Sequence, residues 1–202
     1  GICDNQELYD KYAPMMQKYN PKWGMGDIII KDRTGEGVIN DEDRTVIGNS
    51  IPRFTFGLNL GFEYKGFDFS CFFQGVGKAD GYVTMEAIQP MGINGARKEH
   101  YKESFNPQDP KPGAYFPRIL SSDYNYAYMS HWVQDASYIR LKNLQIGYSF
   151  KIKGLNQLRV YASGENLFTA TKYRTWDPET PVGARGFYPN VAVYSMGVNL
   201  NF

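Results

Sequence analysis

Side chains that carry oxygen recur at the spacing of a calcium-binding loop near the N-terminus. The candidate ligands at loop positions one, three, five, seven, nine and twelve are Asp32, Thr34, Glu36, Val38 through its backbone carbonyl, Asn40 and Asp43. Gly37 stands at position six, where such loops turn, and Ca²⁺ takes about six to eight oxygen ligands. Thr34 and Glu36 replace the usual Asp or Asn, and Asp43 is shorter than the usual Glu. The stretch therefore predicts a structural Ca²⁺ site, with a polar turn leading into a strand as the alternative.

Aromatic side chains form a second group of candidates for binding. Tyr124, Tyr126 and Tyr128 alternate in a loop-like stretch, and with Trp132 and Trp176 they are our candidate contacts for a ligand or a partner. A wider set near the expected loop ends contains Trp132, Tyr138, Tyr173, Trp176 and Tyr188. These residues could stack on sugars, but an interfacial aromatic girdle or loop packing is the interpretation we favour.

The sequence contains no pattern that indicates catalysis. His100 and His131 have no Ser or Cys nucleophile motif beside them. Gly35 and Gly37 stand in an acidic stretch, which would repel a phosphate group. The net charge of +1 gives no indication of a nucleic-acid partner. We therefore predict that the protein is not an enzyme.

The elements that would position these residues are β-strands. Phe54, Phe56, Leu58, Leu60 and Phe62 alternate with small polar residues, and period two is typical of a strand with one apolar face. Similar alternation predicts strands at 67–74, 137–150, 158–168 and 191–202, and a short helix is expected at 5–18. Aromatic residues make up 16% of the chain, which suits β structure. We predict an all-β fold.

The connections between the predicted strands alternate between short and long. Residues 63–66 and 151–156 form short turns, whereas 77–131 and 169–189 form long loops. Transmembrane β-barrels of bacteria have short periplasmic turns and long extracellular loops, and no run approaches the roughly 20 apolar residues of a spanning helix. The pattern predicts a transmembrane antiparallel β-barrel in residues 53–202. Residues 1–52 would then be an extracellular segment that carries the acidic loop, and Phe202 would be periplasmic.

Strict alternation also assigns side chains to faces of the predicted wall. Arg140 and Lys142 share the parity of Leu144, so both are expected on the lipid side at headgroup level, where long cations can reach water. Cys71 is expected to point toward lipid and Cys3 to lie in an external loop, so no disulfide is expected. No signal peptide begins the sequence, and we expect the chain to be part of a longer protein.

Three segments of the chain resemble the SusC/RagA class of TonB-dependent outer-membrane transporters. They are GDIIIKDRTGEGVINDEDRTVIGNSIPRFTFGLNLGFEYKGFDFSCFFQG at 26–75, DASYIRLKNLQIGY at 135–148 and VYASGENLFTATKYRTWDPE at 160–179. The resemblance implies a 22-stranded barrel, of which this chain would supply the C-terminal five strands. It also implies an N-terminal plug and a TonB-binding segment elsewhere. The alternation that runs to Phe202 is similar to the signal read by the barrel-assembly machinery.

The resemblance further implies a function and partners. The family imports bulky nutrients, glycans or peptides, across the outer membrane with energy from TonB, and it works with a SusD-like surface lipoprotein. Two alternatives remain open from the sequence: a soluble calcium-stabilised β-sandwich for glycan adhesion, and a passive porin-like barrel. The apolar row from Phe54 to Leu60 distinguishes the β-sandwich from a barrel. A sandwich would bury this row in a dry core, whereas a barrel would expose it to lipid.

Overall fold

The structure of this chain is a computed structural model that describes residues 1–83, 88–90, 97–110, 112–119, 124–154, 156–180 and 188–202. Contacts between residues divide the chain into two compact units. The first unit combines Gly1–Gly48 with Val83–Val133, and the second combines Asn49–Tyr82 with Gln134–Phe202. The sequence placed a boundary at residue 52, whereas the contacts join the N-terminal segment to most of the long loop that follows the second strand.

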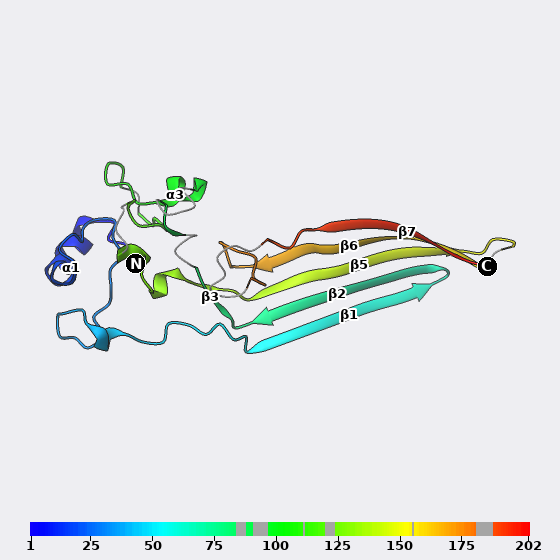
Figure 1. Cartoon of the computed structure of the whole chain (residues 1–202), viewed down its shortest axis with the longest axis horizontal. Coiled ribbons are helices and arrows are strands. Elements are labelled where there is room, and N and C mark those ends of the chain that lie inside the picture. Colours follow the sequence, from blue (N-terminus) through cyan, green and yellow to red (C-terminus); the bar gives the residue numbers. More distant parts are fainter. Residues whose placement is uncertain (84–87, 91–96, 111, 120–123, 155, 181–187) are drawn as a thin grey trace. The chain divides into compact units, whose positions relative to one another are not determined.

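Five antiparallel strands form the main sheet of the second unit (Figure 1). They are β1 (Phe54–Tyr64), β2 (Phe67–Gly77), β5 (Tyr138–Phe150), β6 (Gln157–Thr171) and β7 (Val193–Asn201). Each strand lies beside its neighbour in the order β1-β2-β5-β6-β7, and the sheet is open, with β1 and β7 at its edges. A separate two-stranded sheet pairs β3 (Asp80–Tyr82) with β4 (Val133–Asp135). All five predicted strands are confirmed, although the last one ends at Asn201, one residue before Phe202.

The register of the sheet separates apolar from polar side chains. One row across all five strands consists of Leu60, Cys71, Leu144, Gly164 and Tyr194. The adjacent row, on the opposite face, consists of Gly61, Ser70, Gln145, Ser163 and Ser195. Neighbouring residues of a strand point to opposite faces, so these rows define an apolar face and a polar face. Cys71 therefore lies on the apolar face as predicted, and both Cys71 and Cys3 are free.

The hairpin between β1 and β2 turns within two residues. Lys65 and Gly66 have φ values of 49° and 88°, and Tyr64 pairs directly with Phe67. Positive φ at both central residues is typical of the type I′ turn, whose twist matches that of paired strands. The short turn predicted for residues 63–66 is confirmed.

A β-bulge in β5 changes the face to which its first residues point. Phe72 of β2 pairs with Asn143, but Phe73 pairs with Leu141, so Lys142 is an extra residue in the ladder. An extra residue shifts the alternation by one position. Arg140 consequently lies on the polar face with 3% of its side chain exposed. The prediction that Arg140 and Lys142 lie on the lipid side was therefore wrong, because strict alternation cannot register an inserted residue.

The first unit is built around aromatic residues and a short helix. Helix α1 (Gln6–Tyr19) begins where the Asn5 side chain accepts a hydrogen bond from the Leu8 amide, and it confirms the helix expected at 5–18. Its inner face contributes Met16 to a cluster with Cys3 and Trp23, all of them buried. The described residues of this unit also form the short helices η1 (Asp41–Asp43), α3 (Lys98–Glu103), η2 (Tyr124–Tyr126) and η3 (Ser130–Trp132). Among the described residues, no helix combines the length and apolar character needed to cross a bilayer.

A buried ion pair connects distant segments of the first unit. Arg118 donates two hydrogen bonds to the Asp27 carboxylate, at 2.8 and 2.6 Å, and Asn125 donates a third at 2.9 Å. The Asn125 side-chain oxygen accepts from the Ile28 amide at 2.9 Å. Asp27 is 2% exposed, so its charge needs these partners to be stable in the interior. This network fastens the segment before the acidic loop to residues about ninety positions later in the chain.

Candidate functional site

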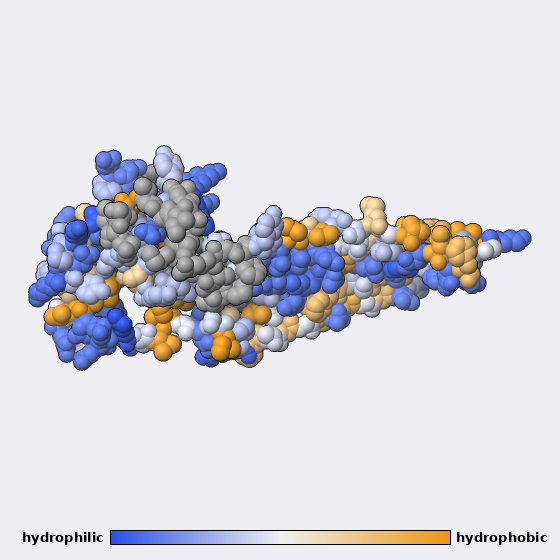
Figure 2. Space-filling view, in the orientation of Figure 1, coloured by the Kyte–Doolittle hydropathy of each residue, from blue (hydrophilic) through white to orange (hydrophobic). Residues whose placement is uncertain are grey.

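The apolar face of the five-stranded sheet is uncovered within its unit. Every residue of β1 is exposed, and Phe54 and Leu58 keep 57% and 49% of their surface accessible. Hydrophilic residues run along the middle of the sheet in Figure 2, with hydrophobic residues toward its margins. A β-sandwich would cover the apolar row with a second sheet, yet the described part of this unit contains no sheet packed on it. The sandwich alternative is therefore not supported.

An ion pair crosses the polar face near the end of the sheet that carries the short turns. Arg159 of β6 reaches over β5 and donates two hydrogen bonds to the Asp68 carboxylate of β2. Gly147 lies beneath this pair, and a Cβ there would stand 2.5 Å from an Asp68 oxygen and 2.7 Å from an Arg159 nitrogen. The glycine therefore provides the space in which the two side chains connect strands that are not adjacent.

A network of four charged residues occupies the other end of the polar face. Arg140 binds Asp177 at 2.8 Å through one terminal nitrogen and Glu179 at 3.1 Å through the other. Lys142, the bulge residue, binds Glu179 at 2.8 Å. Arg140 also donates to the Thr169 hydroxyl at 2.7 Å. The bulge thus places both cations on the polar face, where they hold the segment that follows β6.

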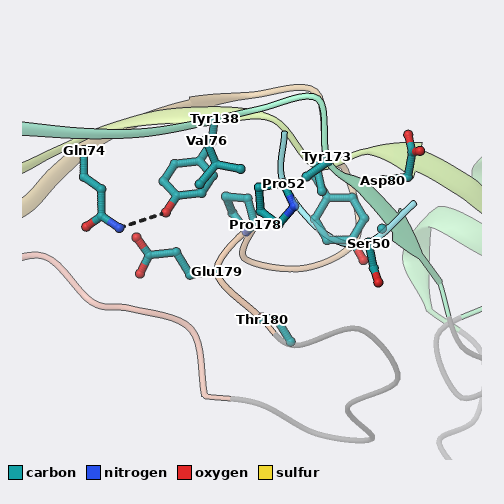
Figure 3. Close-up of a pocket in the computed structure, with 13 residues that line it drawn as sticks. Ser50, Pro52, Gln74, Val76, Asp80, Tyr138, Tyr173, Pro178, Glu179 and Thr180 are labelled. Carbon is teal, nitrogen blue, oxygen red and sulfur yellow. Dashed lines mark hydrogen bonds between the residues drawn. The ribbon is translucent and has the colours of Figure 1, made fainter. Parts of the chain in front are cut away.

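This segment forms one wall of a cavity of about 390 Å³ (Figure 3). The flat surfaces of the lining come from two tyrosine rings and two proline rings, namely Tyr138, Tyr173, Pro52 and Pro178. Its polar groups come from Ser50, Gln74, Asp80, Glu179 and Thr180. Figure 3 shows the Gln74 amide donating to the Tyr138 hydroxyl, and this bond is 3.3 Å long. Rings combined with amide, hydroxyl and carboxylate groups can stack on and hydrogen-bond a polar ring-shaped ligand.

The predicted calcium ligands adopt a compact loop in which backbone amides bind the carboxylates. Asp32 accepts from the amides of Gly35 at 2.6 Å and Gly37 at 2.7 Å, and the Gly37 and Gly35 bonds lower the pKa of its carboxyl. Asp43 accepts from the amides of Asn40 at 3.0 Å and Arg33 at 2.6 Å, which lower the pKa of its carboxyl. Both groups are therefore held as carboxylates, the form that binds Ca²⁺.

The structure places the other predicted ligands around this loop. Glu36 accepts a hydrogen bond from the Asn40 side chain at 3.3 Å, Thr34 donates to Asp32 at 3.2 Å, and Val38 is 43% exposed. Among the described residues, no three His, Cys, Asp or Glu side chains converge on one point. The calcium site stays a prediction, and the amide bonds alone account for the loop geometry.

The five aromatic contact candidates have different positions in the structure. Tyr126 and Trp132 are 1% and 0% exposed, and their rings stack at 6.2 Å in the core of the first unit. The prediction that they contact a ligand was wrong, because close packing leaves them no accessible surface. Tyr124 is half-buried and donates to the Ile28 carbonyl at 2.9 Å. Tyr128 is 88% exposed and Trp176 is half-buried, so both stay available as contacts.

The residues that line the cavity were mostly absent from the sequence-based candidates. Tyr138 and Tyr173 belonged only to the wider aromatic set, and Gln74 and Glu179 were not among the candidate site residues. One signal could have found this region: Arg140 interrupts an apolar row, and an out-of-phase charge in a strand indicates a bulge. The long connection that brings Glu179 back to β5 leaves no comparable signal in the sequence.

Comparison with solved structures identifies the architecture. The chain superposes on the RagAB peptide importer in its "open-open" state with a TM-score of 0.62, 24% identity and coverage of 77% of this chain and 18% of that chain. For the "closed-closed" state the TM-score is 0.65, with 24% identity and coverage of 85% and 20%. At this level of identity the likeness establishes the fold alone, an antiparallel sheet like part of that transporter.

Curated sequences provide the second comparison, whereas no family model matches the chain. TonB-dependent receptor P3 of Formosa agariphila is 34% identical over 201 residues, covering 88% of this chain and 19% of the receptor. TonB-dependent receptor P39 of the same organism is 33% identical over 222 residues, covering 98% and 21%. TonB-dependent receptor SusC of Bacteroides thetaiotaomicron is 27% identical over 208 residues, covering 98% and 19%.

The sequence comparisons show that the chain corresponds to part of a TonB-dependent receptor. Within that class, the chain is similar to SusC in sequence and to part of RagAB in fold. It spans about a fifth of the length of the curated relatives it matches.

Proposed function

We propose that this chain forms part of the wall of an outer-membrane β-barrel, with its apolar face toward lipid and its polar face toward the interior. The five strands contain 9 to 15 residues, and a tilted strand needs about 9–11 to span a bilayer. The observation that carries the proposal is the exposed apolar row beside an equally continuous polar row. In water such a face would favour aggregation, whereas in lipid it is the stable arrangement.

The rest of the barrel would close on the two edge strands. The outer edges of β1 and β7 offer backbone groups that a closed barrel would pair with further strands. The family resemblance implies 22 strands in total. In this arrangement the short turns, and Phe202 with them, lie in the periplasm, and the first unit with the long connections lies outside the cell.

The complete transporter would import bulky nutrients, glycans or peptides, with energy from TonB and with a SusD-like lipoprotein as its partner. The sequence similarity to SusC supports this proposal, and the similar solved structures are those of a peptide importer. The cavity beneath Pro178 offers ring surfaces and hydrogen-bonding groups, which suit the recognition of either class of nutrient. Exposed Tyr128 and half-buried Trp176 remain candidate contacts with nutrient or lipoprotein.

One pair of variants of the complete transporter tests the position in the membrane. Leu58→Arg places a charge on the apolar face, where it would cost about 2–4 kcal/mol near the bilayer centre, and Asn59→Arg places the same charge on the polar face at little cost. We expect low outer-membrane yield for the first variant and normal yield for the second. Equal yields, or recovery of the native protein in the aqueous fraction without detergent, would exclude the proposed wall.

Uptake measurements test the transport function and separate it from a passive pore. We expect uptake of the nutrient to stop in a strain without TonB and in a strain without the lipoprotein. A passive porin-like barrel would continue to admit small solutes in both strains. Uptake that persists without TonB would therefore refute active import while leaving the barrel intact.

Calcium in the Asp32–Asp43 loop stays part of the proposal, with a structural role. Its carboxylates are kept ionised by backbone amides, and the loop lies in the unit that would face the Ca²⁺-rich exterior. Metal analysis of the purified transporter, combined with thermal unfolding before and after chelation, tests it. Absence of calcium together with an unchanged melting temperature would remove the metal and leave the polar turn.

A further inference from the structure

Residues 173–180 leave the end of β6 and fold back over the polar face of the sheet. We call this segment the strap. Its first half is fixed by Gln134, whose side chain accepts from the Arg174 amide at 3.0 Å and donates to the Thr175 hydroxyl at 3.1 Å. Its second half carries Asp177 and Glu179, which bind the two cations of β5. The strap thus has at least two attachments to the rest of the unit, and they consist of different kinds of interaction.

The second attachment consists almost entirely of charge. Glu179 forms ion pairs with Arg140 and Lys142. It also accepts a hydrogen bond of 2.7 Å from the side-chain amide of Asn190. Asp177 orders the chain between the two acidic residues, because it accepts the Glu179 amide at 2.9 Å. Glu179 and Lys142 are each 21% exposed, so solvent and salt reach this side of the network, whereas Arg140 is 3% exposed.

The same half of the strap lines one side of the cavity. Pro178, Glu179 and Thr180 form one wall, and the opposite side includes Ala79 and Ala136, which are 6% and 8% exposed. In Figure 3 the Glu179 carboxylate points toward the hydroxyl end of Tyr138, on the cavity side of the strap. Movement of residues 178–180 away from β5 would therefore widen the opening of the cavity, while the Gln134 attachment could remain in place.

We propose that Arg140 and Lys142, with Asp177 and Glu179, form an ionic latch that fastens the strap over the cavity and controls access to it. The bulge at Lys142 is essential to this device. If Lys142 were deleted, the polar face would lose one cation, and if β5 were a regular strand, Arg140 would point to the apolar face. The latch is separate from the transport proposal: it concerns access to one cavity and can be measured without uptake.

Cysteine reactivity in the full-length, folded transporter tests the latch. Ala136→Cys places a thiol in the cavity wall, and its rate of alkylation by a charged maleimide reports the opening of the strap. Within this chain the native cysteines give a low background, since Cys3 and Cys71 are 0% and 7% exposed, and any cysteine elsewhere in the transporter is replaced by serine. In the Ala136→Cys variant, we expect Glu179→Gln to raise the rate of alkylation about five- to tenfold, because Arg140 and Lys142 each lose one charged partner.

Two further measurements make the test decisive. Glu179→Asp, which keeps the negative charge, should keep the rate closer to that of the intact latch, whereas Lys153→Gln, at an exposed turn residue, should leave it unchanged. If Glu179→Gln fails to fold, the intact latch is measured at increasing salt, and the rate should rise. A rate that responds neither to Glu179→Gln nor to salt would overturn the proposal, as would a Glu179→Asp variant that reacts as fast as Glu179→Gln.

Discussion

Replacing Arg140 by methionine tests the bulge and the charge network together. The Arg140 side chain is 3% exposed, and its partners Asp177 and Glu179 are 10% and 21% exposed, so solvent screens the pair weakly. Removing one member of a buried ion pair costs about 3–5 kcal/mol, because the remaining charge has no partner. Glu179 would keep Lys142, whereas Asp177 would lose its cation. We therefore expect a loss near the lower limit, about 3 kcal/mol.

A different outcome follows if β5 is a regular strand. Arg140 would then point toward lipid at headgroup level, where a charge costs only about 0–1 kcal/mol, and methionine would leave the stability unchanged or slightly raised. Whether the unfolding free energy falls therefore decides between the two arrangements. Denaturant unfolding of the complete transporter in detergent micelles measures this change.

A second variant identifies the cause of the loss. Arg140→Met combined with Asp177→Asn removes both charges but keeps an oxygen that can accept the Glu179 amide. We expect this double variant to lie within about 1 kcal/mol of the native protein, because no buried charge is left uncompensated. Lys153→Met is the control for an exposed cation and should have no measurable effect. A single variant that loses less than about 0.5 kcal/mol, or a double variant no better than the single one, would refute the reasoning.

Three further predictions concern the bulge, the polar face and the first unit. Deleting Lys142 should leave residues 138–141 on their present faces, as cysteine accessibility would show, because it removes only the extra residue. Gly147→Ala should lower the unfolding free energy by about 1–3 kcal/mol by displacing an ion pair, whereas Gly61→Ala on the same face meets only ordinary contacts and should be nearly neutral. Burial lowers the pKa of His131 from 6.5, so the unfolded state binds its proton more readily. Stability should therefore fall as pH drops below about 6.5, and His131→Phe should remove this dependence in thermal unfolding.

The sequence by itself determined the strands and most of their faces. Apolar residues such as Phe54, Phe56 and Leu58 recur at every second position. Because successive residues of a strand point to opposite faces of the sheet, this period predicts one apolar and one polar face. The hairpin turn at Lys65 was equally accessible, because its signal lies in a few adjacent residues. Helix α1 was predicted within one or two residues for the same local reason.

Only the tertiary structure decided which residues form the cavity and the latch. Arg140 and Glu179 are separated in sequence by the whole of β6. They meet because the inserted Lys142 places Arg140 on the polar face of β5, and because the chain folds back over that face after β6. Tyr126 and Trp132 were predicted as contact residues because the spacing of aromatic residues along the chain does not show whether they are buried. Packing against neighbours that are distant in sequence buries both of them. Local patterns depend on neighbours in sequence, whereas burial and charge pairing depend on neighbours in space, which the register and its irregularities determine.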